Sequence, residues 1–327
     1  MKLYMCNSKA NIIWYNLFMK VGVIDIGTLK VKLQIVEMGH SGQFKTIYQS
    51  NNLTCLGCHM EQNNGRPKEE NLQKTLQELI RCKNILDELG VKTSRIVSTH
   101  AIREMGNVGS EIAKLIKNET QLNIEIISQK EEAELFFNAV FKDFKTVKDH
   151  LVIDVGGGSV QILIGNKDKL KTSFLLKTGT STLWDKFTPH HNEMDFPKRK
   201  DVRKMKGYIL AQLQPIPKNI NLPIVYGSSC IIDLFKGIRL PMQKYSHSKS
   251  HPFKARVSDM SDFLDKVWSI PYDIREEKFI SPTYRYMWGV DKAFLNVVEL
   301  AKKIDAPYII PSNQNIGNGL IQSLINN

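Results

Sequence analysis

Two stretches of the sequence place an aspartate at the end of an apolar run, with small residues beginning two positions after it. They are VGVIDIGTLKVKLQIVE at residues 21–37 and LVIDVGGGSVQILIGN at residues 151–166. Glycine lets phosphate oxygens approach backbone N–H groups, because no Cβ stands in the way. Asp25 and Asp154 would lie next to the phosphate, and a carboxylate does not bind a phosphate directly because both are negatively charged. The two aspartates are instead suited to a divalent ion that the phosphate also binds. Together the two loops predict a polyphosphate held from two sides.

Each loop also carries a hydroxyl donor, Thr28 in the first and Ser159 in the second. The spacing matches neither G-x-x-x-x-G-K-[ST] nor G-x-G-x-x-G, so P-loop and dinucleotide-binding interpretations lack support. A single loop of this kind is also explained by a tight hairpin turn. Two copies at matching places favour the phosphate site.

Glu132, near the start of an expected helix, is a third candidate for chemistry. Ser128 followed by Glu131 is a capping box, which gives Glu131 a structural role. Glu132 lies three and four residues before Leu135 and Phe136, so it points toward their apolar face. A carboxylate directed inward is costly unless it is paired, metal-bound or functional. An exposed helix start, where Glu132 only complements the helix dipole, explains the same pattern, and the residues alone leave both interpretations open.

The elements that position these residues predict a duplicated α/β fold. A strand–turn–strand–turn–strand opening occurs at residues 21–49 and again at 151–175. Between the copies we expect helices at 72–89 and 110–120, strands at 95–99 and 124–128, and the helix that starts at Ser128. Beyond them we expect a helix at 197–213, a strand at 222–229, a basic loop at 241–256, a helix at 287–303, and a strand, glycine loop and final helix at 308–324.

This pattern divides the chain into an N-terminal extension at residues 1–18, a first domain at 19–127 and a second at 128–327. The final helix is free to pack back on the first domain. Residues 1–18 resemble no signal peptide, because their apolar run is short and lacks a small-residue cleavage site. An ordinary structured N-terminal segment is the alternative to an extension.

The 327 residues are 42% hydrophobic, but the net charge of +12 and the pI near 9.3 are unusual. A basic surplus favours polyanionic partners such as nucleic acid, anionic membrane or phosphate-rich substrates. No apolar run approaches the roughly 20 residues that span a bilayer. No interleaved aromatic motif supports nucleic-acid stacking. We therefore expect a cytoplasmic protein that binds neither membrane nor nucleic acid.

Two further features are less specific. The basic residues of the helix at 197–213 would guide an anionic chain to the site, or they form a solvated face; they are Lys198, Arg199, Lys200, Arg203, Lys204 and Lys206. Cys55, Cys58 and His59 match the C-x-x-C-H pattern of haem attachment. No export signal and no second pair support haem or zinc, so we expect a loop with two reduced thiols.

Four ordered motifs resemble the exopolyphosphatase/guanosine pentaphosphate phosphohydrolase (Ppx/GppA) family. They are VIDIGT…K at 23–32, STHAIRE at 98–104, ISQKEEAEL at 127–135 and LVIDVGGGSVQ at 151–161. The family belongs to the actin/Hsp70/sugar-kinase superfamily. The resemblance therefore implies two ribonuclease-H-like (actin-like ATPase) domains whose mixed sheets face a central cleft.

The resemblance also implies a reaction, the release of terminal phosphate from inorganic polyphosphate or guanosine pentaphosphate with Mg²⁺ (or Mn²⁺), by a chain that forms a homodimer. Glu132 matches the glutamate that positions the attacking water, and Asp25 and Asp154 match metal-associated aspartates. Arg103 matches an arginine near the terminal phosphate, although a surface ion pair with Glu104 is the alternative. The residues that match the phosphate loops are Gly27, Thr28, Gly156, Gly157, Gly158 and Ser159, and we expect Lys30 and Lys32 to bind phosphate as well.

The sequence departs from the family pattern at several of these positions. Leu29 and Lys30 stand where Asn-Ser is usual, Lys32 replaces an arginine, and Gln161 replaces a glutamate. These changes favour a second interpretation, a catalytically weak polyphosphate- or alarmone-binding protein of the same fold. A small-molecule kinase would also use twin phosphate loops, but it needs an adenosine pocket and a substrate base that the sequence does not identify.

Overall fold

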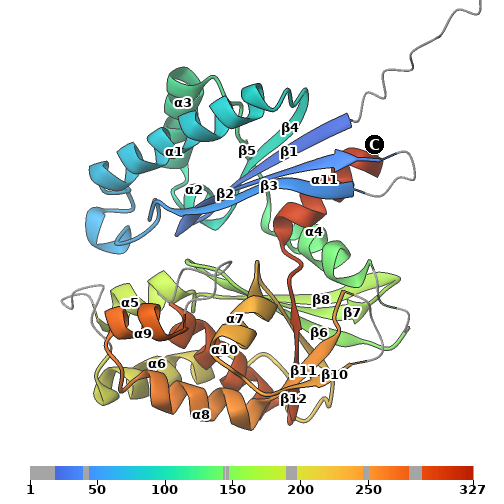
Figure 1. The fold of residues 1–327 in the computed structure, drawn as a ribbon. Helices are drawn as coiled ribbons and strands as arrows, with labels where there is room; N and C mark the ends of the chain where they lie inside the picture. Colours follow the sequence, from blue (N-terminus) through green and yellow to red (C-terminus); the bar gives the residue numbers. More distant parts are fainter. Residues whose placement is uncertain are drawn as a thin grey trace, which may run out of the picture.

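The structure is a computed structural model that describes residues 19–39, 44–142, 144, 147–188, 197–245, 250–279 and 289–326. The expected N-terminal extension at residues 1–18 lies outside them. The described chain forms two α/β parts, one above the other in Figure 1, which we call the first and second halves. Each half is built on one mixed sheet, so the predicted fold class is confirmed.

The sheet of the first half has the strand order β3-β2-β1-β4-β5. Its strands are β1 (Met19–Ile26), β2 (Lys30–Met38), β3 (Phe44–Leu53), β4 (Thr93–Ser98) and β5 (Glu125–Ile126). In β1, Ile24 and Ile26 pack under helices α1 (Glu69–Glu88) and α3 (Asn107–Thr120), whereas Val21 and Val23 pack on the opposite face. Because β1 is covered on both faces, its sequence is a nearly continuous apolar run.

The sheet of the second half has the order β10-β11-β12-β9-β6-β7-β8. Its strands are β6 (His150–Val155), β7 (Val160–Asn166), β8 (Lys169–Leu176), β9 (Ile224–Gly227), β10 (Met242–Lys244), β11 (Phe253–Arg256) and β12 (Tyr308–Ser312). One face is covered by α5 (Thr180–Phe187), α6 (Arg199–Gln212), α7 (Ile231–Gly237), α8 (Val257–Val267) and α10 (Val290–Lys303). The remaining helices are η1 (Glu61–Asn63), α2 (His100–Glu104), α4 (Gln129–Phe141), α9 (Tyr272–Phe279) and α11 (Ile316–Asn326).

The two halves repeat one strand order, β3-β2-β1-β4-β5 in the first and β8-β7-β6-β9-β12 in the second. The repeat extends to single residues. In the first loop the N–H of Gly27 donates to Lys30 O, and in the second the N–H of Gly156 donates to Ser159 O, both at 2.9 Å. Asp25 lies opposite Lys32 in the β1–β2 pair, as Asp154 lies opposite Gln161 in the β6–β7 pair. The two loops are therefore structurally equivalent.

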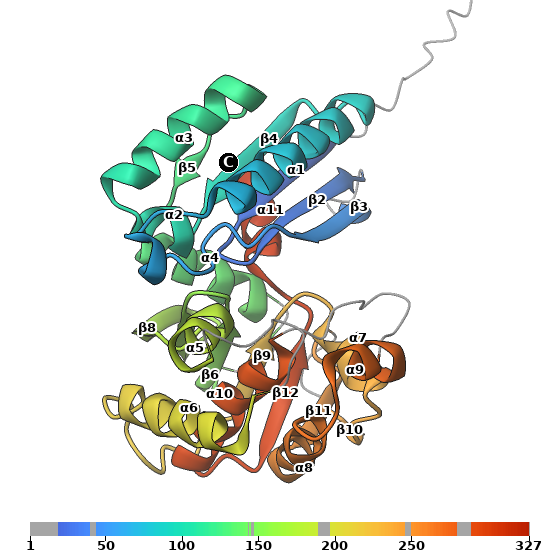
Figure 2. The same ribbon diagram turned by 90° about the vertical axis from the view of Figure 1, so that its left-hand side faces the viewer.

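Helix α4 lies between the halves (Figure 2) and contributes to both cores. Phe136 packs with Val152 of the second sheet, whereas Leu135 packs with Val21 and Leu320 on the first. The C-terminal helix α11 returns to the first half and covers β1 beside α4 (Figure 1). This crossing ties the last segment of the chain to its first strand.

Only one of the two hydrogen bonds of the predicted capping box forms at the start of α4. Ser128 Oγ accepts a hydrogen bond from the N–H of Glu131 at 3.1 Å. The Glu131 carboxylate, which a capping box would return to the Ser128 N–H, accepts from Arg95 Nη2 at 2.6 Å. The prediction of a reciprocal box is therefore wrong, because a nearby guanidinium is a stronger donor than a neutral amide.

Three predicted elements differ from the structure. Residues 241–256 were expected to be a loop, but they include β10 and β11, while 246–249 lie outside the described residues. β5 is only two residues long where residues 124–128 were expected. The helix expected at 287–303 begins at Val290 in the described chain. The loop prediction failed because edge strands carry polar side chains and lack the apolar alternation of central ones.

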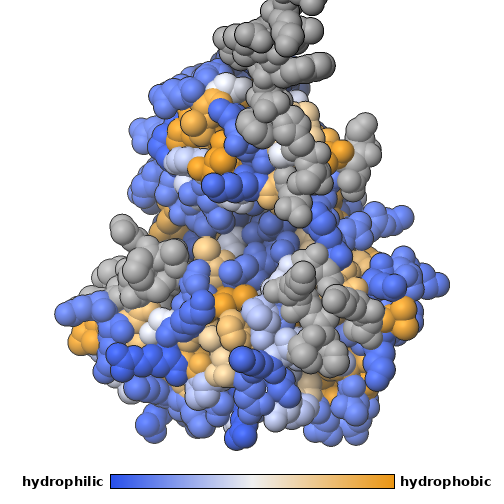
Figure 3. Space-filling view, turned by 45° about the vertical axis from the view of Figure 1, so that its right-hand side comes forward, coloured by the Kyte–Doolittle hydropathy of each residue, from blue (hydrophilic) through white to orange (hydrophobic). Residues whose placement is uncertain are grey.

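No helix within the described ranges is long and apolar enough to cross a bilayer. Hydrophilic residues cover most of the face drawn in Figure 3.

We expect Leu320→Ala to lower the free energy of unfolding by about 2 to 5 kcal/mol, because it leaves a cavity between α11, α4 and β1. Urea unfolding followed by circular dichroism measures this loss. Leu210→Ala is the matched control, since Leu210 on α6 is 37% exposed, and it should change stability by less than about 1 kcal/mol. Equal losses in the two variants would contradict the packing of α11 on β1 and α4.

Candidate active site

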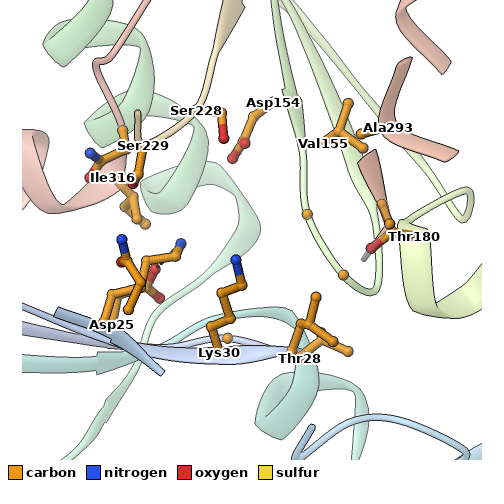
Figure 4. A pocket seen from close by; sticks show the side chains of 18 of the residues that line it. Asp25, Thr28, Lys30, Asp154, Val155, Thr180, Ser228, Ser229, Ala293 and Ile316 are labelled. Atoms are coloured by element: carbon orange, nitrogen blue, oxygen red, sulfur yellow. Dashed lines mark hydrogen bonds and ion pairs between the residues drawn. The ribbon is translucent and has the colours of Figure 1, made fainter. Parts of the chain in front are cut away.

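The two loops line one cavity of about 600 Å³ between the halves. In Figure 4, Asp25, Thr28 and Lys30 belong to the first half, and Asp154 and Ser228 face them from the second. The predicted site residues that line the cavity are Asp25, Gly27, Thr28, Lys30, Lys32, Glu132, Asp154, Gly156, Gly157, Gly158 and Ser159. Arg103 is the one predicted site residue that does not line it.

The glycines of the second loop allow the two loops to touch each other. A Cβ at Gly157 would lie 3.0 Å from Leu29 Cβ, and a Cβ at Gly158 would collide with the His100 ring and the Thr28 hydroxyl. The sequence interpretation assigned these glycines to the approach of phosphate. The structure shows that close packing of loop on loop requires them as well.

The carbonyl groups of the second loop are held by the start of α5. The N–H groups of Thr180 and Ser181 donate to Gly156 O and Gly157 O at 3.0 and 2.8 Å, and Thr182 Oγ1 donates to Gly158 O at 2.7 Å. The N–H groups of Gly157 and Gly158 donate to no acceptor within the described residues. Backbone N–H groups without a protein acceptor are available to an anion, which is what the sequence predicts for this loop.

Glu132 is buried, so an exposed helix start is excluded. Its side chain is 11% exposed, and its Oε2 accepts from Arg103 Nη1 at 2.9 Å. Burial raises the pKa of Glu132 to about 7; the Arg103 guanidinium opposes this, and the carboxylates of Asp154 and Asp25 add to it. The carboxyl group therefore changes protonation near neutral pH.

Arg103 lies behind Glu132, on the short helix α2 that follows β4. Besides Glu132, its Nη1 donates to Ile127 O at 3.0 Å. Its Nη2 is buried without an acceptor among the residues that the structure describes. The alternative of a surface ion pair with Glu104 is not what the structure shows, because the guanidinium faces α4.

Asp25 and Asp154 differ in their surroundings. Asp25 Oδ2 accepts from Lys32 Nζ at 2.8 Å, while its Oδ1 is buried without a hydrogen-bond partner in the described chain. Removal from water raises the pKa of Asp154 to about 6, with Lys32 opposing the shift and Asp25 adding to it. Burial alone would lower the pKa of Lys32, but the carboxylates of Asp25, Asp154 and Glu132 outweigh it and raise that pKa.

The oxygen atoms in the cavity fit a hard divalent cation that the substrate helps to bind. Asp25 Oδ1 and Gln161 Oε1 are buried without partners among the described residues, and Asp154 lies beside them on the cavity wall. Mg²⁺ keeps several waters and uses one or two carboxylates together with substrate phosphates. Across the described ranges, Cys55, Cys58 and His59 included, no group of three or more His, Cys, Asp or Glu side chains is placed to hold a metal alone.

The cavity also has walls that the sequence interpretation missed. Ser228 and Ser229 come from the small-residue turn after β9, which is visible in the sequence but was not assigned to the site. An apolar wall joins the cavity from α7 and α10, and its residues are Ile231, Leu234, Val290, Ala293 and Phe294. Helical apolar spacing gives no sign that one end of such a face borders a cavity. No residue of the basic helix α6 lines the cavity.

The sequence model of the Ppx/GppA phosphatase family matches residues 35–261. The chain is 27% identical over 251 residues to a bifunctional 3-dehydroquinate synthase/phosphatase of Fusobacterium nucleatum, a match over 74% of this chain and 37% of that protein. It is 23% identical over 196 residues to exopolyphosphatase 1 of Mycobacterium leprae, over 60% of this chain and 56% of that protein. The chain thus spans only part of these curated relatives, 56% of the length of the Mycobacterium leprae protein and 37% of that of the Fusobacterium nucleatum protein.

Solved structures share the fold across nearly the whole chain. An exopolyphosphatase from Cytophaga hutchinsonii superposes with a TM-score of 0.78 at 24% identity, over 94% of this chain and 98% of that one. A Ppx/GppA family member from Aquifex aeolicus gives a TM-score of 0.71 at 24% identity, over 95% and 99%. These likenesses establish the two-part architecture.

The raised pKa of Glu132 predicts how stability depends on pH. Between the ordinary value of 4.5 and about 7, the folded protein keeps this proton while the unfolded chain releases it. The free energy of unfolding therefore falls as pH rises through this window, by about 3 kcal/mol from this group. Glu132→Gln removes the titration, so urea unfolding at several pH values should show a flatter profile than the wild type.

Glu104→Gln is the control for this experiment, because Glu104 is exposed on α2 and should leave the wild-type slope unchanged. If wild type and Glu132→Gln lost stability equally between pH 4.5 and 7, the pKa of Glu132 would not be raised.

Proposed function

Because the chain belongs to the Ppx/GppA phosphatase family, we propose that it hydrolyses the terminal phosphoric anhydride bond of inorganic polyphosphate between its two halves. The observation that carries the proposal is the position of Glu132, buried in the wall of the cavity that both glycine loops line. A general base works best when its pKa lies near the operating pH, and the pKa of about 7 meets that condition.

In the proposed reaction, a water held by the Glu132 carboxylate attacks the terminal phosphorus and gives a proton to that carboxylate. The bond from this phosphorus to the bridging oxygen breaks, and the shortened chain leaves as an anion. Arg103 holds Glu132 through Nη1, which fixes the orientation of the base. Arg103 thus acts through Glu132, because its guanidinium does not line the cavity and its Nη2 is buried.

The two loops would neutralise the phosphate oxygens during this step. The N–H groups of Gly157 and Gly158 and the hydroxyls of Thr28 and Ser159 are donors of the right kind, and Lys30 adds a charge. A Mg²⁺ (or Mn²⁺) held by Asp25, Asp154 and the phosphates would reduce the negative charge on the transferring group. Lys32 limits how far Asp25 can serve a cation, because its ammonium already bonds Oδ2.

Guanosine pentaphosphate is the second candidate substrate, and the apolar wall is the observation that favours it. Ile231, Val290 and Ala293 are buried but line the cavity with apolar atoms, which a nucleoside base could contact, whereas polyphosphate has no apolar group to do so. A catalytically weak binding protein is the alternative that Leu29 and Gln161 favour. The choice among these functions is made by measuring turnover.

We expect phosphate release from long-chain polyphosphate with Mg²⁺ and no acceptor, and we expect Glu132→Ala to lower kcat by about 10² to 10⁴, the usual contribution of a general base. A phosphate assay with polyphosphate and, separately, guanosine pentaphosphate identifies the substrate. Glu104→Ala is the control and should keep wild-type rates. Tight binding of either compound without any release would replace the hydrolase with the binding protein, and release that needs an acceptor would indicate a kinase.

The Arg103 guanidinium lowers the pKa of Glu132, so its removal should shift the dependence of activity on pH. For the wild type, kcat/KM should rise as pH increases through about 7, where the carboxyl group loses its proton. Arg103→Gln should move this rise to higher pH in addition to lowering the rate. Arg66→Gln, at an exposed ion pair with Glu111, should leave the profile in place. A rate loss in Arg103→Gln without a shift would show that Arg103 does not act through Glu132.

A further inference from the structure

The segment from Thr54 to His59, which follows β3, holds the first glycine loop by its backbone. The N–H groups of Thr54 and Cys55 both donate to Leu29 O, at 3.1 and 3.0 Å, and the N–H of Gly57 donates to Thr28 O at 2.9 Å. Gly57 packs so closely on Thr28 that a Cβ there would lie 2.7 Å from Thr28 Cγ2. Any shift of this segment therefore moves the first loop.

The same segment reaches the second half beside the second loop. Cys58 Sγ lies 3.6 Å from Ser181 Oγ, and the Ser181 N–H is one of the donors that hold Gly157 O. The N–H of His59 donates to Asp185 Oδ2 at 2.7 Å, farther along α5. Cys58 thus belongs to the segment that holds the first loop, and its side chain contacts Ser181, which holds the second loop.

The geometry of Cys55 and Cys58 permits a bond between them. The N–H of Cys58 donates to Cys55 O at 3.0 Å, which closes a turn of four residues. Such turns bring their end Cα atoms within about 7 Å, and disulfides span about 4.4 to 6.8 Å between Cα atoms. Both cysteines are free thiols in this structure. The neighbouring Cys55 thiol and burial both raise the pKa of Cys58.

We propose that Cys55 and Cys58 are a redox modification site that a low-molecular-weight disulfide oxidises to an intramolecular disulfide, and that this bond weakens phosphate binding by the two loops. Cys55 is half-exposed and Cys58 is buried, so the oxidant reaches Cys55 first. The consequence for catalysis rests on the proposed function, but the consequence for phosphate binding does not.

The reaction proceeds by two thiol–disulfide exchanges. The Cys55 thiolate attacks one sulfur of the oxidant RSSR, forms a mixed disulfide and releases the other half as RSH. The Cys58 thiolate then attacks Cys55 Sγ and displaces the second RSH. The two cysteines lose two electrons and two protons, and RSSR is reduced to two RSH. Because Cys58 Sγ must turn from Ser181 toward Cys55, the bond removes a contact that supports the second loop.

Peptide mapping tests whether the disulfide forms. The intact protein is incubated with glutathione disulfide or with dithiothreitol, alkylated and digested with trypsin. Both cysteines fall in the peptide from Thr46 to Lys68, because trypsin does not cut between Arg66 and Pro67. We expect this peptide from the oxidised sample to be lighter by two hydrogen atoms and to resist alkylation. Alkylation of both cysteines after oxidation would overturn the proposal.

Calorimetry with tripolyphosphate tests the consequence without requiring turnover. We expect oxidation to weaken binding by about ten-fold or more, since small misplacements of binding groups are costly, and dithiothreitol to restore it. Cys55→Ser should abolish the response to glutathione disulfide, and Cys58→Ser should stop the reaction at the mixed disulfide on Cys55. Cys82→Ala, on α1 and away from both loops, should retain the response. Unchanged affinity in the oxidised protein would contradict the coupling, and a response that persists in Cys55→Ser would show that a disulfide between Cys55 and Cys58 does not cause it.

Failure of the hydrolase proposal would be seen separately. A reduced protein that releases no phosphate from either substrate would remove the catalytic function, while the peptide map and the tripolyphosphate affinity would still decide on the disulfide.

Discussion

The removal of acidic side chains from water is the constraint on which the rest of the site depends. Glu132 and Asp154 hold pKa values of about 7 and about 6 because burial disfavours their charged forms, and Asp25 raises both. Two cations offset this cost: Lys32 bonds Asp25 and Arg103 bonds Glu132. Both cations come from the first half, on β2 and α2, and Lys32 also lowers the pKa of Asp154 on β6 of the second half. The charge of Asp154 is therefore offset only when the halves lie together.

The two equivalent hairpins, β1–β2 and β6–β7, give their aspartates different neighbours. The same register places Lys32 opposite Asp25 and Gln161 opposite Asp154. The aspartate of the first half therefore has an ammonium partner, whereas that of the second faces a neutral amide whose Oε1 has no partner among the described residues. Under the proposed function, this asymmetry would favour Asp154 over Asp25 as the ligand of a divalent ion, and it would give the departure at position 161 a physical consequence.

The sequence predicted the duplicated fold because β1 and β6 are apolar runs that end in the same turn. Most of the predicted site residues line one cavity for the same reason, since equivalent turns lie at equivalent ends of two facing sheets. The pairing of Arg103 with Glu132 could not be predicted, because it joins α2 to α4 and depends on how β4 and β5 bring these helices together. The contact between the two loops could not be predicted either. A glycine in the sequence shows that a Cβ is absent, but it does not show whether a phosphate or a neighbouring residue occupies that space.

Hydrolysis of polyphosphate in water enriched in ¹⁸O tests the central claim most directly. Attack by a Glu132-held water on the terminal phosphorus predicts that the label enters the released phosphate, at a rate that collapses in Glu132→Ala. Label in the shortened chain would place the attack on the neighbouring phosphorus, and release that is unaffected by Glu132→Ala would assign the base to another residue. Either result would contradict hydrolysis by a water that Glu132 activates at the terminal phosphate.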